Sequence, residues 1–155
     1  MNLYHLAQAN VARMRAPLDD PSMADFVALL DPVNEIADKS PGFVWRLQTE
    51  TGNSADVRVF DDPRILFNMS VWTSIDALRA FAYQSQHLDV FRQRQKWFER
   101  FERGSHVLWW LPVGRLPTVA EACTRFTALW EHGPLPEGFT FQRPYAPPAE
   151  VLRPV

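Results

Sequence analysis

Apolar and polar residues alternate along several segments of the chain, which predicts β-strands. In Leu3 to Val11, the residues Leu6, Gln8 and Asn10 alternate with their neighbours, a period of two that is typical of a strand. The same alternation predicts three further main strands, at residues 43–48, 65–72 and 106–111, the last bounded by Pro112. Asp56 to Phe60, between two turns, predicts an additional short strand.

Other segments carry apolar residues at steps of three and four, which predicts helices. The first begins at Asp20, an N-cap followed by Pro21 at the first helical position, and Pro32 inside it predicts a kink. The last helix begins at Thr118, which forms a capping box with Glu121, and ends near Gly133.

The middle helix follows the third main strand and is the longest of the predicted helices. Thr73 or Ser74 caps it, and a bend is expected near Ser85. The apolar spacing then resumes and continues through Phe101, so the helix is expected to run to Gly104.

The order β-α-β-β-α-β predicts an α+β fold, the ferredoxin-like split β-α-β arrangement, with an extra C-terminal helix and a Pro-rich arm. Residues 1–142 are expected to form a single domain and 143–155 a Pro-rich C-terminal tail, loose after about Arg143. The sheet face opposite the two helices is expected to be uncovered and apolar. It is predicted to carry Asn10, Asn68, Ser70, Trp72 and one set of the rings at Trp45, Trp109 and Trp110. Either a second copy, closing a dimeric α+β barrel, or the C-terminal helix and arm must cover it.

Composition narrows the classes of function. The 155 residues carry a formal net charge of -2, which argues against nucleic acid or an anionic membrane as partner. Apolar runs are too short to cross a bilayer, and the N-terminus lacks a secretory signal, so a cytoplasmic location is expected. Aromatic residues make up 13%, which suggests a ring-lined pocket or interface as well as a core. The single cysteine, Cys123, lies at helical spacing with apolar residues and is expected in a core.

Candidate chemistry centres on the third main strand. Asn68, Ser70 and Trp72 project from one side of it, where an amide and an indole can orient an aromatic or enol substrate. The structural alternative is that these residues, with Asn10, close hydrogen bonds at a buried dimer seam. Arg46 is either a pocket cation or a side chain pointing to solvent.

No metal or organic cofactor is expected from the motifs. The histidines at 5, 106 and 132 show no metal-ligand spacing, and no Gly-rich phosphate loop, nucleophile elbow or dinucleotide fingerprint is present.

Several segments together resemble the bacterial family known as domain of unknown function 3291. They are Leu6-Ala7-Gln8-Ala9-Asn10-Val11-Ala12-Arg13, Ser40-Pro41-Gly42-Phe43-Val44-Trp45-Arg46-Leu47, Arg58-Val59-Phe60-Asp61-Asp62-Pro63, Asn68-Met69-Ser70-Val71-Trp72, Trp97-Phe98 and Trp109-Trp110-Leu111-Pro112. The resemblance covers about residues 3 to 141 and supplies no established activity. The family lies near the dimeric α+β-barrel superfamily of antibiotic-biosynthesis-type monooxygenases and haem-degrading oxygenases.

That superfamily implies two sets of site residues. In its cofactor-independent anthrone oxygenases an asparagine and a tryptophan border the substrate pocket at the spacing of Asn68 and Trp72, but their aromatic acid-base partner is matched here by Leu78. In its haem-degrading branch an asparagine, a tryptophan and an iron-ligating histidine lie on the elements that carry Asn10, Trp72 and His87.

The leading hypothesis is a cytoplasmic homodimer that binds a small hydrophobic or aromatic molecule, acting as a monooxygenase-like enzyme without a cofactor. Trp72 and Asn68 would then hold the substrate, Asn10 would polarise a carbonyl or enolate oxygen, and His87 or Tyr83 would carry the proton. Further expected substrate-binding residues are Trp45, Arg46, Ser70 and Trp110. The alternatives are a non-catalytic binding or assembly module and a haem-binding or haem-degrading protein.

Overall fold

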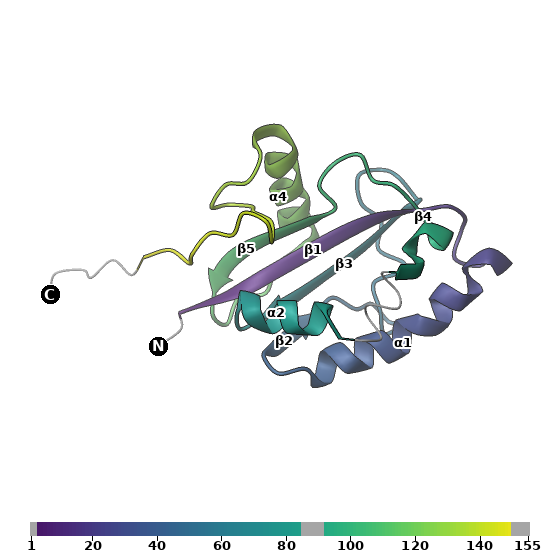
Figure 1. Ribbon diagram of the computed structural model, residues 1–155, viewed down its shortest axis with the longest axis horizontal. Coiled ribbons are helices and arrows are strands. Elements are labelled where there is room, and N and C mark those ends of the chain that lie inside the picture. The colour runs from purple at the N-terminus through teal and green to yellow at the C-terminus, as the bar shows by residue number, and fades with distance from the viewer. Residues whose placement is uncertain (1–2, 85–91, 150–155) are drawn as a thin grey trace, which may run out of the picture.

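An antiparallel sheet forms the centre of the protein in the computed structural model, which describes residues 3–84 and 92–149 (Figure 1). Its strands are β1 (Tyr4–Met14), β2 (Phe43–Arg46), β3 (Ile65–Trp72), β4 (Phe98–Glu99) and β5 (His106–Pro112). β3 pairs along one edge of β1, and β5 and β4 share the other edge, so β1 is central. The spatial order of the four long strands, β5-β1-β3-β2, confirms the predicted α+β, ferredoxin-like fold.

The helices begin at side-chain caps that the sequence predicts. The Asp20 carboxylate accepts from the backbone N–H of Ser22 at 2.9 Å, and a short 3-10 turn (Pro21–Met23) leads into α1 (Ala24–Lys39), which continues through Pro32. Ser74 caps α2 (Ile75–Ala82), and Thr118 caps α4 (Val119–His132). Residues 92–97 are also helical.

The two faces of the sheet are covered by different elements of the same chain. α1 and α2 lie on one face, where Leu6, Trp72 and Leu108 pack with Ala37 and Leu78 (Figure 1). We call this side the helix face. α4 and segment 47–64 cover the opposite face, which we call the α4 face; its core includes Ala7, Ala9, Phe67, Met69, Val71, Val107, Trp109, Ala122 and Phe126.

This covering corrects the predicted uncovered face. Asn10, Asn68, Ser70, Trp72 and Trp110 lie on the helix face, whereas Trp45 and Trp109 belong to the α4 face. The central residues of the α4 face are buried within one chain, so the C-terminal helix supplies the cover and a second copy is not needed for it. The homodimer stays a prediction.

Two element predictions are wrong. Asp56 to Phe60 is not a strand: Phe60 and Asp61 adopt left-handed φ values of 56° and 53°, and the segment makes only the bridge between Val59 and Asp62. The helix expected to reach Gly104 ends at Trp97, because Phe98 and Glu99 pair with the end of β1 as β4. Phe98 then packs against Phe26 of α1 with 5.0 Å between ring centroids.

The Pro-rich arm runs along the outer edge of β5. Leu108 and Phe139 exchange two backbone hydrogen bonds, each 2.8 Å long. The Tyr145 hydroxyl donates to the Pro134 carbonyl at 3.1 Å, so the arm is held two residues beyond the expected limit at Arg143. Residues 146–149 are exposed, and the last part of the arm leaves the body of the protein (Figure 1).

Candidate functional site

Three side-chain amides form a closed ring of hydrogen bonds on the helix face, in the middle of the sheet. Gln8 Nε2 donates to Asn68 Oδ1 (3.2 Å), Asn68 Nδ2 donates to Asn10 Oδ1 (2.6 Å), and Asn10 Nδ2 donates to Gln8 Oε1 (3.4 Å). We call these three residues the amide ring. Each carboxamide nitrogen has two hydrogens, so Asn10 and Asn68 each keep an N–H beyond the ring.

Strand register brings the ring together. Asn10 lies directly opposite Asn68, and Gln8 lies opposite Ser70, in the antiparallel β1–β3 pair. Opposite residues of such a pair project to the same side of the sheet at close range. The ring therefore follows from two strands that are 60 residues apart in sequence.

The helix layer leaves the ring accessible at one end. Gln8 and Ser70 are both 8% exposed, whereas Asn10 is half-buried and Asn68 is exposed, although it sits at the centre of β3. Polar groups that are buried without partners cost free energy, and the ring supplies partners at its buried end. The exposed end can meet a ligand.

Trp72 lies next to the buried end of the ring as a packing residue. Its ring is fully buried, stacks on Phe81 of α2 (centroids 5.1 Å apart) and meets Phe43 edge-on. Its Nε1–H donates to Ser70 Oγ at 2.8 Å, and Ser70 also accepts from Gln8 Nε2 at 2.7 Å. Trp72 thus supports the amide ring through Ser70 and has no exposed surface for a ligand.

His106 continues the polar row onto β5. It lies opposite Asn10 in the β1–β5 pair, so His106, Asn10 and Asn68 form one row across three strands. His106 Nε2 accepts from the backbone N–H of Phe141 at 3.2 Å, and the two rings lie 5.2 Å apart. Burial lowers the pKa of His106 below its usual value, which favours the neutral imidazole.

Two of the expected substrate-binding residues lie away from the ring. Trp45 packs into the core of the α4 face. Arg46 donates to both carboxylate oxygens of Asp38, at 2.7 and 3.3 Å, and to the Gly52 carbonyl at 2.7 Å. Its charge ties β2 to α1 and to the following loop.

The remaining expected residues are scattered. Trp110 lies on the helix face, but the arm covers it: its Nε1 donates to the Tyr145 carbonyl at 2.8 Å. Tyr83, an expected proton carrier, follows the last residue of α2 and is 68% exposed. His87, the other expected proton carrier and the candidate haem ligand, lies outside the described residues.

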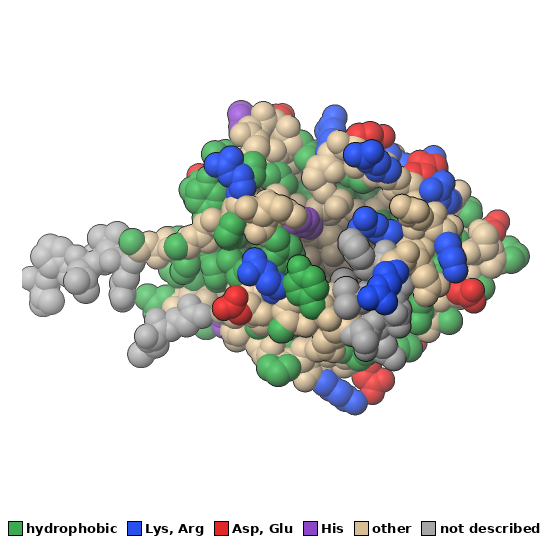
Figure 2. Space-filling model, viewed as in Figure 1, with side chains coloured by type: hydrophobic (Ala, Val, Ile, Leu, Met, Phe, Trp, Pro, Cys, Tyr) green, Lys and Arg blue, Asp and Glu red, His purple; other side chains and the backbone are tan. Residues whose placement is uncertain are grey.

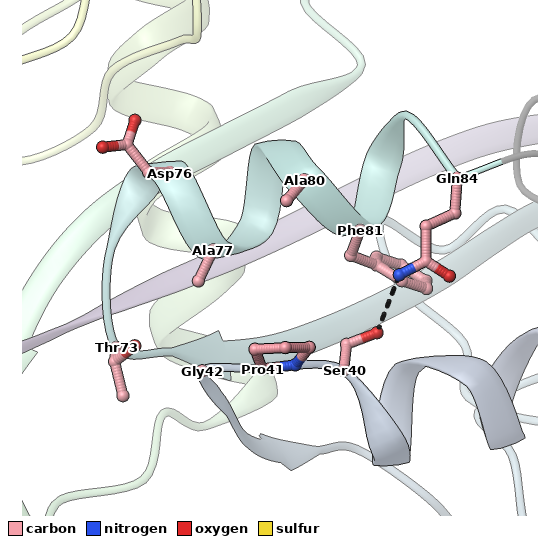
Figure 3. Close-up of a pocket in the computed structure, with 9 residues that line it drawn as sticks. All are labelled: Ser40, Pro41, Gly42, Thr73, Asp76, Ala77, Ala80, Phe81 and Gln84. Atoms are coloured by element: carbon pink, nitrogen blue, oxygen red, sulfur yellow. Dashed lines mark hydrogen bonds between the residues drawn. The ribbon is translucent and has the colours of Figure 1, made fainter.

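A pocket of about 360 Å³ opens between the α1–β2 turn and α2 (Figure 3). Ala77, Ala80 and Phe81 point from α2 toward Pro41 and Gly42, while Asp76 points away. Gln84 Nε2 donates to Ser40 Oγ at 3.3 Å across one end. The lining is mainly apolar, and Phe81 separates the pocket from Trp72 by stacking on it.

Sequence reasoning missed Gln8 and His106. Gln8 shares a side of β1 with Asn10, so the alternation along β1 was a signal that could have found Gln8. His106 becomes part of the row only through pairing of β1 with β5, which no local pattern reveals.

The described residues, 3–84 and 92–149, contain neither a candidate metal cluster nor a candidate membrane-spanning helix. No group of three or more His, Cys, Asp or Glu side chains there is arranged to hold a metal ion. None of the helices in that part of the chain has both the length and the apolar character to span a bilayer.

Comparison with solved structures identifies the fold. A conserved protein from Methanosarcina mazei matches with a TM-score of 0.51 at 10% identity, over 72% of this chain and 94% of its own. A Pseudomonas aeruginosa protein matches with a TM-score of 0.50 at 12% identity, over 76% and 99%. SnoaB, a cofactor-independent oxygenase from Streptomyces nogalater, matches with a TM-score of 0.49 at 21% identity, over 74% and 98%. The first two show a shared fold.

Comparison with curated proteins gives no match. A family model, by contrast, matches residues 5–153, which is nearly the whole chain. The protein belongs to the family described as Domain of unknown function (DUF3291).

Proposed function

We propose that this protein binds a small aromatic or hydrophobic molecule through an oxygen atom of that molecule, at the exposed end of the amide ring. The observation that carries the proposal is the exposure of Asn68 at the centre of a sheet whose other helix-face residues are largely buried. Asn10 and Asn68 each keep an N–H donor beyond the ring, and the ring holds both amides in place. Donors fixed in this way bind a carbonyl or enolate oxygen with little loss of side-chain entropy.

The surroundings favour an apolar body for the ligand. Phe81 and Phe141 are partly buried and pack on the helix face. On this face the Lys and Arg side chains gather mainly in the half of the molecule that holds β4 and the start of α1, whereas apolar side chains gather toward the arm and β5 (Figure 2). A neutral molecule with flat apolar surface and one polar oxygen fits such surroundings better than a polyanion.

In its catalytic form the site would oxidise such a molecule with O2 and no cofactor. Donors aimed at an oxygen stabilise the enolate of a ketone, and an anthrone enolate reacts with O2 directly. The balanced reaction takes anthrone and O2 to anthraquinone and water: the methylene carbon loses two hydrogens, the first as a proton to solvent water, and gains one oxygen. Asn10 and Asn68 would hold the enolate oxygen, and the fold supplies the apolar surroundings.

Binding is tested with two probes of the same shape. The protein is titrated with anthrone and with anthracene, which lacks the oxygen, and binding is measured by the quenching of tryptophan fluorescence. Anthrone should bind more tightly than anthracene. Asn68→Ala combined with Asn10→Ala should weaken anthrone binding about tenfold and leave anthracene unchanged. Gln95→Ala, an exposed amide outside the ring, is the matched control. Equal affinity of the wild-type protein for both probes would exclude the proposal.

Catalysis needs a separate measurement. Anthraquinone formation by the wild-type protein, with consumption of O2, would support the oxygenase form. Binding without turnover would restrict the protein to the binding module that the sequence left as an alternative.

A further inference from the structure

His106 occupies a position in the candidate site that the proposed function has not used. It stands in the same row as Asn10 and Asn68, on the β5 side of Asn10. Its side chain is half-buried, between the sheet and the C-terminal arm. A histidine in this place can contact the ligand oxygen that the two asparagines bind.

The arm determines which nitrogen of His106 carries the proton. An imidazole nitrogen that accepts a hydrogen bond has no hydrogen, and Nε2 accepts from the Phe141 backbone N–H at 3.2 Å. In the neutral ring the proton is therefore on Nδ1, and that nitrogen is a donor. Burial, which lowers the pKa of His106, keeps the ring in this neutral form near pH 7.

Two other side chains contact the Phe141 ring. The His106 ring lies against it, with 5.2 Å between the ring centroids. The guanidinium carbon of Arg79, on α2, lies 5.6 Å from the centre of the Phe141 ring. The residue thus links β5 to α2 across the helix face. Two residues earlier, Phe139 is anchored to Leu108 by two backbone hydrogen bonds.

We infer that His106 is a ligand-contacting residue of the proposed site, a neutral imidazole whose Nδ1–H donates to the ligand oxygen, and that the Phe141 backbone N–H is the positioning group that fixes this tautomer. The inference rests on the proposed function and names the part of the ligand that is read: an acceptor oxygen, carbonyl or enolate. A neutral imidazole polarises a carbonyl by donating its N–H to the carbonyl oxygen, as is known in other enzymes. The arm is then a wall of the site.

The tautomer is measured without any ligand. Long-range proton–nitrogen NMR spectra of the labelled full-length protein at pH 7.5 should show His106 protonated at Nδ1. Phe141→Pro removes the backbone donor and should give a mixture of tautomers, whereas Phe141→Leu keeps the donor and should retain the wild-type spectrum. A wild-type His106 protonated at Nε2 would overturn the inference while leaving the amide ring untouched.

The contact with the ligand is measured as the ratio of the Kd values of anthracene and anthrone. His106→Leu should reduce this ratio about tenfold, because one donor to the oxygen is lost. His106→Asn should restore it, since an Asn amide nitrogen lies near the position of Nδ1, whereas His106→Gln, which places its amide near Nε2, should not. If the wild-type protein prefers anthrone and His106→Leu keeps that preference, the inference fails and the proposed function stands; if the wild-type protein shows no preference, both fail.

Discussion

Gln8, the buried member of the amide ring, is expected to stabilise the fold. Gln8→Leu keeps the side-chain volume nearly constant and removes the hydrogen bonds to Ser70, Asn68 and Asn10. Each such bond contributes about 1 kcal/mol net, and burying a leucine in place of the amide returns about 1 kcal/mol. We expect the free energy of unfolding to fall by about 2 kcal/mol, and the Tm by about 6 °C for a chain of this length.

The assay is urea unfolding followed by tryptophan fluorescence, with the midpoint and the slope fitted separately. Gln95→Leu, at an exposed amide, should change the free energy of unfolding by less than about 0.5 kcal/mol. Adding Asn10→Ala to each background measures the coupling of the two amides, expected at about 0.5–1.5 kcal/mol. A Gln8→Leu variant as stable as the wild-type protein, or coupling near zero, would show that the ring adds nothing to the fold.

Three other expectations follow from particular contacts. Because burial lowers the pKa of His106 in the folded state, the unfolded chain takes up the proton first as pH falls below about 6.5. The free energy of unfolding should therefore decrease from pH 7 toward pH 5.5, by less than about 1.4 kcal/mol per pH unit. A pH series on His106→Asn should lack this part of the decrease. Gly42→Ala should lower the free energy of unfolding by about 1–3 kcal/mol more than Gly52→Ala, as measured by thermal unfolding. Both glycines have positive φ, but a Cβ at Gly42 would lie 2.5 Å from a side chain of α2, whereas nothing lies within 4 Å of a Cβ at Gly52. Equal losses would mean that the close approach to α2 relaxes freely. Trp72→Phe keeps an aromatic ring against α2 and loses the indole hydrogen bond, so the free energy of unfolding by denaturant should fall by about 1–2 kcal/mol. An unchanged free energy of unfolding would mean that water replaces that bond.

Local patterns in the sequence determined most of the elements. Alternation located the four long strands, and the side-chain oxygens of Asp20 and Thr118 marked two helix starts where the structure has them. These features depend on residues a few positions apart, so a linear reading captures them. The same alternation placed Asn68, Ser70 and Trp72 on one side of β3, and the structure agrees.

Tertiary packing decided what covers each side of the sheet. Alternation shows that two residues share a side, but it contains nothing about which layer packs there. The asparagines and Trp72 were therefore predicted on an uncovered face. They lie on the face that carries α1 and α2, where Trp72 is buried and Asn68 is exposed, while α4 buries the opposite face. Long-range pairing also overrode a local preference at Phe98, where the end of β1 draws the chain into β4.

The candidate site divides in the same way. The sequence by itself supplied Asn10 and Asn68 and the expectation of a polar group facing an aromatic molecule. Only the tertiary structure joined them to Gln8 in a ring, set His106 in their row, and brought Phe141 of the C-terminal arm onto that histidine. The physical reason is distance along the chain: Gln8 and Asn68 are 60 positions apart, and His106 lies still farther from Asn10. Strand register brings these residues together, and register is fixed by the whole sheet.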